Sequence, residues 1–196
     1  MQEFRTIKKE IRILAWDDGP FEFKKRGKDI LIGVISRGAV TIDGILKTEI
    51  EIDGLDATEK IIEKTIKTKH KDLRVMMLDG ITFAGFNIVD IKEIYKKTKI
   101  PVIVVNRKKP NFKKFISTLK KLSHPEKRLK CVENAGPIYW ANVKNRRICF
   151  QCSGIKREDA EKIIKITSTM SLIPEPLRIA HLIATGIILG ESVGRA

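Results

Sequence analysis

A buried apolar strand that ends in an aspartate is the feature of this sequence that most constrains the fold. Residues 75–78 are all apolar (Val-Met-Met-Leu) and run directly into Asp79 and Gly80. A short continuous apolar run is typical of a strand buried on both faces in the middle of an α/β sheet. An aspartate at its carboxyl end lies on the edge where open α/β sheets bind their ligands. We therefore interpret Asp79 as a candidate functional residue, although an aspartate here can also simply cap the following turn.

A second apolar stretch, residues 11–17, ends in the same way on Asp17. The turn-forming residues 18–20 (Asp-Gly-Pro) then break it. Parallel strands that lie side by side end at the same edge of a sheet, so we expect Asp17 and Asp79 to meet there. Asp18 is the weaker candidate, because the last residue of the strand should face this edge while Asp18 suits the turn.

The order of the expected elements predicts an α/β fold. Three strands in an antiparallel meander come first, and helices then alternate with two strands that should be parallel. This order predicts a mixed sheet flanked by helices, in a single domain that covers residues 1–196. The expected strands are 11–17, 30–35, one from 40 with an edge segment at 48–52, 75–79 and 101–105, with one or two more in 131–151. The expected helices are 57–69, one with its apolar side at 88–95, 111–122, 157–169 and 174–189.

The charge of the chain favours a polyanionic partner. Its 196 residues include 39 Lys and Arg against 24 Asp and Glu, a formal net charge of +15. Such an excess indicates nucleic acid before any acidic membrane surface, although Lys-rich surfaces are also common in heat-adapted proteins. Two basic stretches are the candidates for phosphate contacts: Lys24, Lys25 and Arg26 in the first, Arg107 and Lys108 in the second.

The sequence predicts a cytoplasmic protein with no membrane partner. Its start is charged and lacks the apolar core of a signal peptide. The longest apolar run, 179–189, contains His181 and is too short to span a bilayer. Three cysteines cannot make a full disulfide framework. The sequence leaves the oligomeric state open.

Two carboxylates at one sheet edge predict a metal site. They repel each other unless a proton or a cation neutralises them, and a site of carboxylate oxygens suits Mg²⁺ or Mn²⁺. Such an ion binds phosphate oxygens and lowers the pKa of bound water. Asp17 and Asp79 are therefore the expected ligands. Asp56, or else Asp53, is the candidate third carboxylate, although Asp56 equally suits the N-cap of the helix that follows it.

The last expected helix carries two further candidates. Arg178 and His181 are three residues apart and so share one face of this helix. If that face lies over the sheet edge, His181 can orient a water molecule and Arg178 can hold a phosphate. The alternative for His181 is a partly buried side chain satisfied by a backbone carbonyl.

Three motifs resemble those of endonuclease V. They are residues 13–17 (Ile-Leu-Ala-Trp-Asp), 78–80 (Leu-Asp-Gly) and 174–181 (Pro-Glu-Pro-Leu-Arg-Ile-Ala-His), in the same order along the chain. The octapeptide is the most specific of them. The chain is still more similar to an uncharacterised archaeal family related to endonuclease V, which shares Asp-Asp-Gly, Asp-Gly-Leu-Asp-Ala-Thr and Leu-Asp-Gly-Ile-Thr-Phe-Ala-Gly-Phe-Asn.

This resemblance implies a ribonuclease H-like fold and a metal-dependent phosphodiesterase site. Asp17 and Asp79 would be the metal ligands, His181 would lie beside the site, and Asp56 or Asp53 would take the place of a glutamate. Two parts of endonuclease V are missing. Residues 49–54 lack its Pro-Gly wedge, and residues 81–87 replace its His-Pro-Arg segment. The resemblance therefore covers the metal site and not the parts that recognise a deaminated base.

Three functions remain as hypotheses. The first is a Mg²⁺- or Mn²⁺-dependent nuclease that acts on DNA or RNA, with Asp17, Asp79, Asp56 and His181 as its catalytic residues. The second is a nucleic-acid-binding protein that keeps the fold without the chemistry. The third is an enzyme acting on a nucleotide or phosphate ester, for which the sequence offers no Gly-rich phosphate loop.

Overall fold

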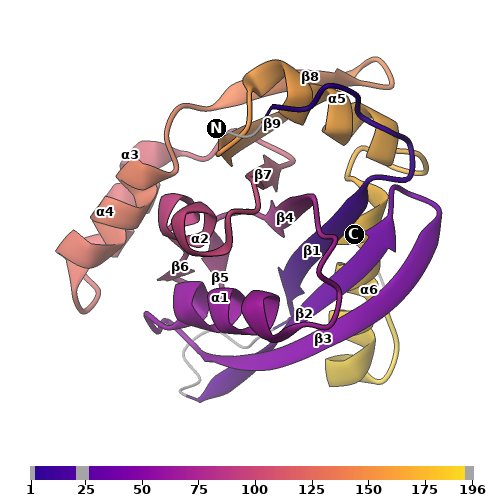
Figure 1. Cartoon of the computed structure of the whole chain (residues 1–196). Helices are drawn as coiled ribbons and strands as arrows, with labels where there is room; N and C mark the ends of the chain where they lie inside the picture. Colours follow the sequence, from indigo (N-terminus) through magenta and orange to yellow (C-terminus); the bar gives the residue numbers. More distant parts are fainter. Residues whose placement is uncertain (1–2, 21–26, 193–196) are drawn as a thin grey trace.

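A seven-stranded mixed sheet with helices on both faces forms the centre of the molecule (Figure 1). The computed structural model describes residues 3–20 and 27–192. The strand order is β3-β2-β1-β4-β7-β9-β8, and a separate two-stranded hairpin consists of β5 and β6. The strands are β1 (Arg12–Asp18), β2 (Lys28–Arg37), β3 (Thr41–Glu51), β4 (Val75–Asp79), β5 (Thr82–Phe83), β6 (Asn87–Ile88), β7 (Val102–Asn106), β8 (Tyr139–Val143) and β9 (Arg146–Ser153). The helices are α1 (Ala57–Lys67), α2 (Ile91–Thr98), α3 (Phe112–Leu119), α4 (Pro125–Asn134), α5 (Arg157–Thr167) and α6 (Glu175–Leu189).

The antiparallel meander and the parallel centre of the sheet are both confirmed. β2 pairs antiparallel with β1 and with β3, and the register shift opposite Ile35 and Ser36 leaves Asp43 as an extra residue in a β-bulge. β1, β4 and β7 are parallel neighbours, in which Trp16 pairs with Leu78 and Leu78 with Val104. The carboxyl ends of these three strands therefore lie together at one edge of the sheet.

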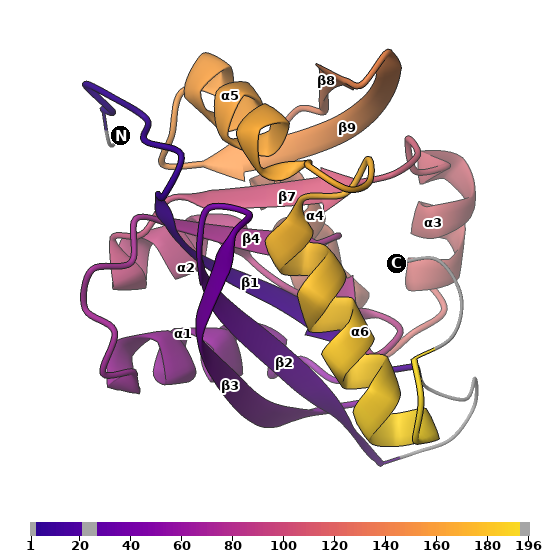
Figure 2. The ribbon, with the colours of Figure 1, turned by 90° about the vertical axis from the view of Figure 1, so that its right-hand side faces the viewer.

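Alternation along β1 assigns its residues to two different cores. Leu14 and Trp16 pack on the face covered by α1 and α2, whereas Ile13 and Ala15 pack on the face of α5 and α6. Helix α6 lies across β1 and β2 on the second face (Figure 2). Because side chains alternate along a strand, Asp17 lies on the α6 face and Asp18 on the opposite face.

Two expected elements are wrong in part. Ile88 was expected to begin the apolar side of a helix but lies in β6, because the positive φ angles of Ala84 and Gly85 close a hairpin. The helix starts only at Ile91, where the Asp90 carboxylate accepts hydrogen bonds from two backbone N–H groups. Residues 131–134 were expected in a strand and instead end α4, which Pro125 begins.

None of the helices in the described part of the chain combines the length and apolarity needed to cross a bilayer. The first basic stretch of the sequence, Lys24, Lys25 and Arg26, lies outside the described residues.

Candidate active site

An open pocket lies at the carboxyl ends of β1, β4 and β7. Its volume is about 540 Å³, a size typical of ligand pockets. Three aspartates and a histidine line it, together with the last residue of β7 and the two basic residues that follow this strand. These residues are Asp17, Asp18, Asp79, Asn106, Arg107, Lys108 and His181. The structure thus brings together Asp17, Asp79 and His181, which the sequence separates by up to 164 positions.

Asp17 and His181 form a direct pair. Asp17 is buried, and its Oδ2 lies 3.0 Å from Nδ1 of His181. This hydrogen bond, and the charges of Asp17 and Asp79, raise the pKa of His181 above its ordinary value, against the opposing effect of burial. Because Nδ1 donates to the carboxylate, Nε2 is the ring nitrogen that remains for a ligand in the pocket. The alternative of a histidine satisfied by a backbone carbonyl does not describe this contact.

Asp79 is the second carboxylate of this site, next to Asp17. The pairing of Trp16 with Leu78 places Asp17 and Asp79 next to each other on adjacent strands. Burial, and then the charge of Asp17, raise the pKa of Asp79 to about 7, while Arg107 and His181 act to lower it. A carboxylate pair with this property is stabilised by a proton or by a cation.

Asp18 belongs to the same pocket, which the sequence interpretation underrated. β1 continues through Asp18, which pairs with Leu31 of β2. Its Oδ2 accepts a hydrogen bond of 2.5 Å from the backbone N–H of Ala84 in the β5–β6 connection. Burial, and then the charge of Asp17, raise its pKa well above the ordinary value. Strand alternation continued by one residue would have indicated its position on the other face.

The structure does not bring Asp56 or Asp53 into this pocket. Asp56 Oδ1 accepts hydrogen bonds from Glu51 N at 3.1 Å and from Asn87 Nδ2 at 2.7 Å. Asp56 stands at the N-cap position of α1 without a side-chain cap. Asp53 Oδ1 accepts a hydrogen bond of 2.8 Å from the backbone N–H of Phe86. Both carboxylates hold the loop before α1 against the β5–β6 hairpin.

Asn87 is a buried residue of this loop region that the sequence interpretation missed. Its Oδ1 accepts from the backbone N–H of Ala57 at 3.1 Å, and its Nδ2 also donates to the carbonyl of Glu51. Asn87 thus satisfies the start of α1 in place of an N-cap side chain. An asparagine inside an otherwise apolar run was the signal in the sequence.

Arg178 and Arg107 differ in their position relative to the pocket. Arg178 Nε donates to Oε1 of the buried Glu175 at 2.9 Å, and this contact raises the pKa of Arg178. Arg178 is therefore paired within α6 and is not among the residues that line the pocket. Arg107 and Lys108, from the second basic stretch, do line it.

The donor set of the pocket fits a hard divalent cation in part. Asp17 and Asp79 supply carboxylate oxygens, the ligands that Mg²⁺ and Mn²⁺ prefer. Within residues 3–20 and 27–192, no three His, Cys, Asp or Glu side chains are arranged to hold an ion together. Mg²⁺ commonly uses one or two carboxylates and completes its shell with water and substrate phosphates. Two carboxylates beside an open pocket match that pattern.

Family and sequence comparisons agree over nearly the whole chain. The family model described as endonuclease dU matches residues 9–188. A UPF0215 protein of Methanosarcina barkeri is 50% identical over 191 residues, covering 97% of both chains. A UPF0215 protein of Thermococcus sibiricus is 45% identical and covers 96% of this chain and 97% of its own length.

Solved structures show the same fold. A protein of unknown function from Archaeoglobus fulgidus aligns with a TM-score of 0.82 and 40% identity, covering 90% of this chain and 98% of that one. Ciona intestinalis endonuclease V, in complex with a DNA that contains an inosine, aligns with a TM-score of 0.57 and 16% identity over 87% and 82% of the two chains. Marinitoga piezophila Argonaute aligns with a TM-score of 0.52 and 13% identity over 90% of this chain and 30% of that one. The sheet is therefore of the ribonuclease H-like, endonuclease V-like type.

Proposed function

The chain belongs to the endonuclease dU family of archaeal endonuclease V-like proteins, and from its acidic pocket we propose a divalent-metal-dependent nuclease that hydrolyses phosphodiester bonds in DNA or RNA. The observation that carries this proposal is the meeting of Asp17, Asp79 and His181 at one sheet edge beside Arg107. Acidic ligands for a cation and basic groups for a polyanion then stand in one pocket, as phosphodiester hydrolysis requires.

Asp17 and Asp79 would hold Mg²⁺ or Mn²⁺. A bound ion of this kind supplies neutralisation of the phosphate charge and a lowered pKa of bound water. The raised pKa of Asp79 supports this role, because a cation would stabilise the ionised pair that burial and mutual repulsion disfavour. Asp17 also accepts the hydrogen bond from His181 and so orients the imidazole.

His181 would act on the substrate through Nε2. Its raised pKa favours the imidazolium form, which donates a proton from Nε2 to a phosphate oxygen or to the leaving oxygen. Arg107 and Lys108 would bind the phosphates next to the cut bond. Asp18 would position the β5–β6 hairpin through the backbone of Ala84.

Recognition of the substrate would differ from that of endonuclease V. Residues 82–88 form the strands and turn of a hairpin here, and Thr82 of this hairpin lines the pocket. The His-Pro-Arg segment of endonuclease V is absent from it. We therefore expect a preference among modified bases that is not centred on inosine.

A cleavage assay tests the proposed function. Labelled DNA and RNA strands that carry inosine, deoxyuridine or neither would be incubated with the protein and Mg²⁺, Mn²⁺ or EDTA. We expect metal-dependent cleavage, reduced at least ~100-fold in Asp79→Asn, since a catalytic metal site supplies several kcal/mol.

A matched control is available at the amino end of β4. Asp72 is 64% exposed and pairs with Arg12, so Asp72→Asn removes an aspartate without touching the pocket. Cleavage should remain in this variant. If no strand is cut under any condition, or if Asp79→Asn cuts as well as the unmodified protein, the nuclease proposal fails. Salt-sensitive binding without cleavage would then favour a non-catalytic nucleic-acid-binding protein.

A further inference from the structure

The β8–β9 hairpin stands at the same edge of the sheet as the pocket. Asn106, which lines the pocket, pairs with Cys149 of β9, and Cys149 pairs with Trp140 of β8. Since β9 runs antiparallel to β7, the turn at Lys144 and Asn145 lies beyond the carboxyl end of β7. Figure 2 shows this turn and α3 on the side where β1, β4 and β7 end.

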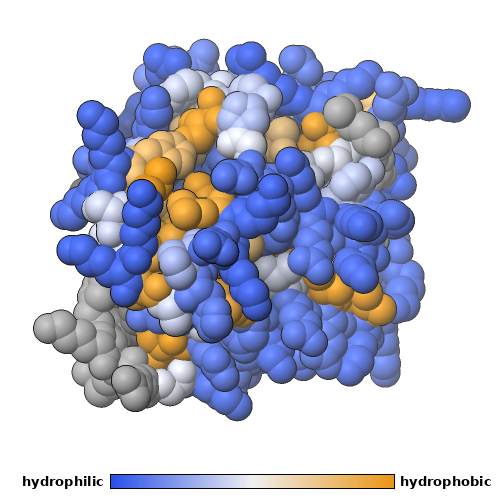
Figure 3. Space-filling view, turned by 90° about the vertical axis from the view of Figure 1, so that its left-hand side faces the viewer, coloured by the Kyte–Doolittle hydropathy of each residue, from blue (hydrophilic) through white to orange (hydrophobic). Residues whose placement is uncertain are grey.

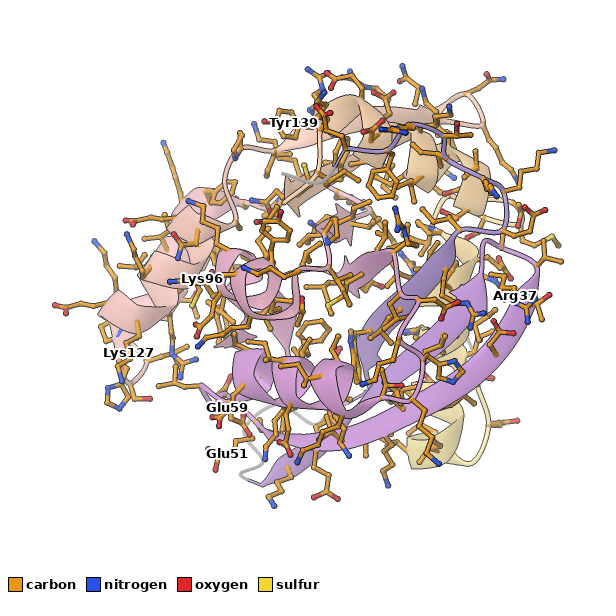
Figure 4. All side chains as sticks on the ribbon, in the orientation of Figure 1. Arg37, Glu51, Glu59, Lys96, Lys127 and Tyr139 are labelled. Carbon is orange, nitrogen blue, oxygen red and sulfur yellow. The ribbon has the colours of Figure 1, made fainter. Side chains whose placement is uncertain are left out.

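An aromatic ring and a guanidinium are stacked on this hairpin. The guanidinium of Arg147 lies 4.8 Å from the ring centroid of Trp140. Arg147 is exposed and Trp140 is partly exposed. Their side chains lie on the face opposite Tyr139, which packs with Phe150 in the core under α5 and is marked in Figure 4. Trp140 and Arg147 therefore offer flat groups at the β8 margin of the sheet, outside the core.

Two long stretches of the chain, one of which contains this pair, carry positive charge and no negative charge. Residues 94–125 and 134–157 contain no aspartate or glutamate, and they include the segment after β7, the whole of α3 and the β8–β9 hairpin. Figure 3, which views the side of the molecule on which α3 and α4 lie, shows a mostly hydrophilic surface interrupted by apolar side chains. A basic surface with an aromatic group is the pattern by which proteins bind single-stranded nucleic acid.

The distance to the pocket suits a bound strand. Three strand spacings separate Asp79 on β4 from Trp140 on β8, which amounts to about 14 Å across the sheet at ~4.8 Å per spacing. At the duplex rise of ~3.4 Å per nucleotide this separation corresponds to about four nucleotides, and an extended single strand covers it with fewer. Strand alternation places Trp140 on the face covered by α1 and α2, and Asp79 on the face of α6. A nucleic-acid strand that reaches both therefore passes over the edge of the sheet, where Asp18 and Asn106 line the pocket from the first face. Arg107 and Lys108 follow β7 and line the pocket at one end of this path.

We propose that Trp140 and Arg147 form a stacking site for a base of the single-stranded nucleic acid that flanks the phosphodiester bond in the pocket. The inference rests on the proposed function for its ligand. Trp140 contributes its ring to the base, and Arg147 contributes a planar cation that can stack or contact a phosphate. The partner is recognised by its phosphates and its unpaired base, whether the sugar is ribose or deoxyribose.

Tryptophan fluorescence tests this site directly. The chain has two tryptophans, and the other one, Trp16, is fully buried. Titration with oligo-dT and oligo-rU in EDTA should therefore quench emission from Trp140 alone, and the quenching should disappear in Trp140→Phe. Using both sugars shows whether DNA or RNA is preferred, and EDTA keeps the strands intact.

Affinity measurements with labelled strands compare variants of the stacking pair with a matched arginine control. Trp140→Ala and Arg147→Ala should each weaken binding about fivefold or more, as expected for loss of a base stack. The control is Arg157→Ala, which removes an arginine stacked 5.2 Å over Tyr139 on the opposite face. Arg157→Ala and Arg147→Ala each remove one positive charge, so the two variants have the same net charge. Arg157→Ala should bind within about twofold of the unmodified protein.

The possible outcomes separate this inference from the proposed function. No quenching, equal losses in Arg147→Ala and Arg157→Ala, or equally tight binding of a blunt duplex would overturn the stacking site, even if cleavage occurs. Quenching and selective loss in a protein that cuts no strand would support the stacking site and overturn the nuclease proposal.

Discussion

Asp17 connects the two functional contacts of the pocket. One of its oxygens accepts the hydrogen bond from His181, and its charge helps raise the pKa of Asp79 on the neighbouring strand. The same carboxylate therefore favours the cationic form of the histidine and opposes ionisation of the second aspartate. A divalent ion would relieve the second effect without removing the first.

Replacing Asp17 with asparagine should lower the pKa of His181. The carboxylate is the largest cause of the raised value, and an uncharged amide favours the imidazolium far less. As pH rises, His181 in Asp17→Asn should lose its proton earlier than in the unmodified protein. The Cε1–H resonance followed by NMR measures this titration, and His181→Gln assigns the signal among three histidines.

The His181 titration has a control variant and an outcome that would contradict the contact with Asp17. Asp72→Asn, at the far end of β4, should leave the His181 titration unchanged. An equal pKa for His181 with and without the Asp17 carboxylate would mean that the contact of 3.0 Å does not persist in solution.

Some site residues could be predicted from sequence and others could not. Asp17 and Asp79 each follow an apolar run, so their meeting followed from parallel pairing alone. Asp56 stands in the loop before a helix. At such a position the sequence cannot distinguish a metal ligand from a carboxylate that accepts hydrogen bonds from the backbone and from Asn87. The role of Asp18 depends on Ala84, 66 residues away, and no local pattern reports such a contact.

At the scale of elements, a buried arginine of α4 stabilises the β5–β6 hairpin through hydrogen bonds. Arg128 of α4 is 1% exposed. Its guanidinium donates to the carbonyls of Asp53 at 2.6 Å, Gly54 at 2.9 Å and Phe86. Its Nε donates to the carbonyl of Ser123 at 2.9 Å. The Arg128 guanidinium thus connects α4, the loop before α1 and the hairpin beside the pocket.

Arg128→Met should destabilise the protein by about 3 kcal/mol or more. The methionine fills much of the volume but leaves several buried carbonyls without a donor, and each such loss costs about 1–3 kcal/mol. Urea unfolding at neutral pH measures the change. The hairpin amides, including that of Phe86, should also lose protection in hydrogen exchange.

The matched variant for this measurement is Lys130→Met on the same helix. Lys130 is 68% exposed and forms an ion pair with the equally exposed Glu133. Its replacement should change the free energy of unfolding by no more than about 0.5 kcal/mol. Equal effects of the two substitutions would contradict the structural role of Arg128.

The hairpin and α4 are also the elements that sequence predicted least well. Strands of two residues are too short to show alternation, and Ile88 happens to continue the helical spacing of Ile91 and Ile94. The central strands were predictable because burial on both faces leaves continuous apolar runs, as at residues 102–105. The hairpin depends instead on tertiary contacts, with Arg128 of α4 and, through its own Asn87, with the start of α1.

At the scale of the whole molecule, charge and topology act on the same edge. The parallel strands bring two carboxylates together at their carboxyl ends, and the basic segment after β7 borders them. The remaining positive charge, part of the +15 of the chain, extends along α3 and the β8–β9 hairpin. This arrangement favours a polyanion that reaches the acidic pair only together with a cation.

The proposed nuclease activity depends on the binding of one divalent ion by Asp17 and Asp79 between two adjacent strands. Soaking crystals of the protein in Mn²⁺ and measuring an anomalous difference map tests this claim most directly. We expect a peak in contact with both carboxylates, beside His181, that is absent from crystals of Asp79→Asn. A map with no peak at this pair, or with Mn²⁺ bound at Asp56 and Glu51 instead, would contradict the account.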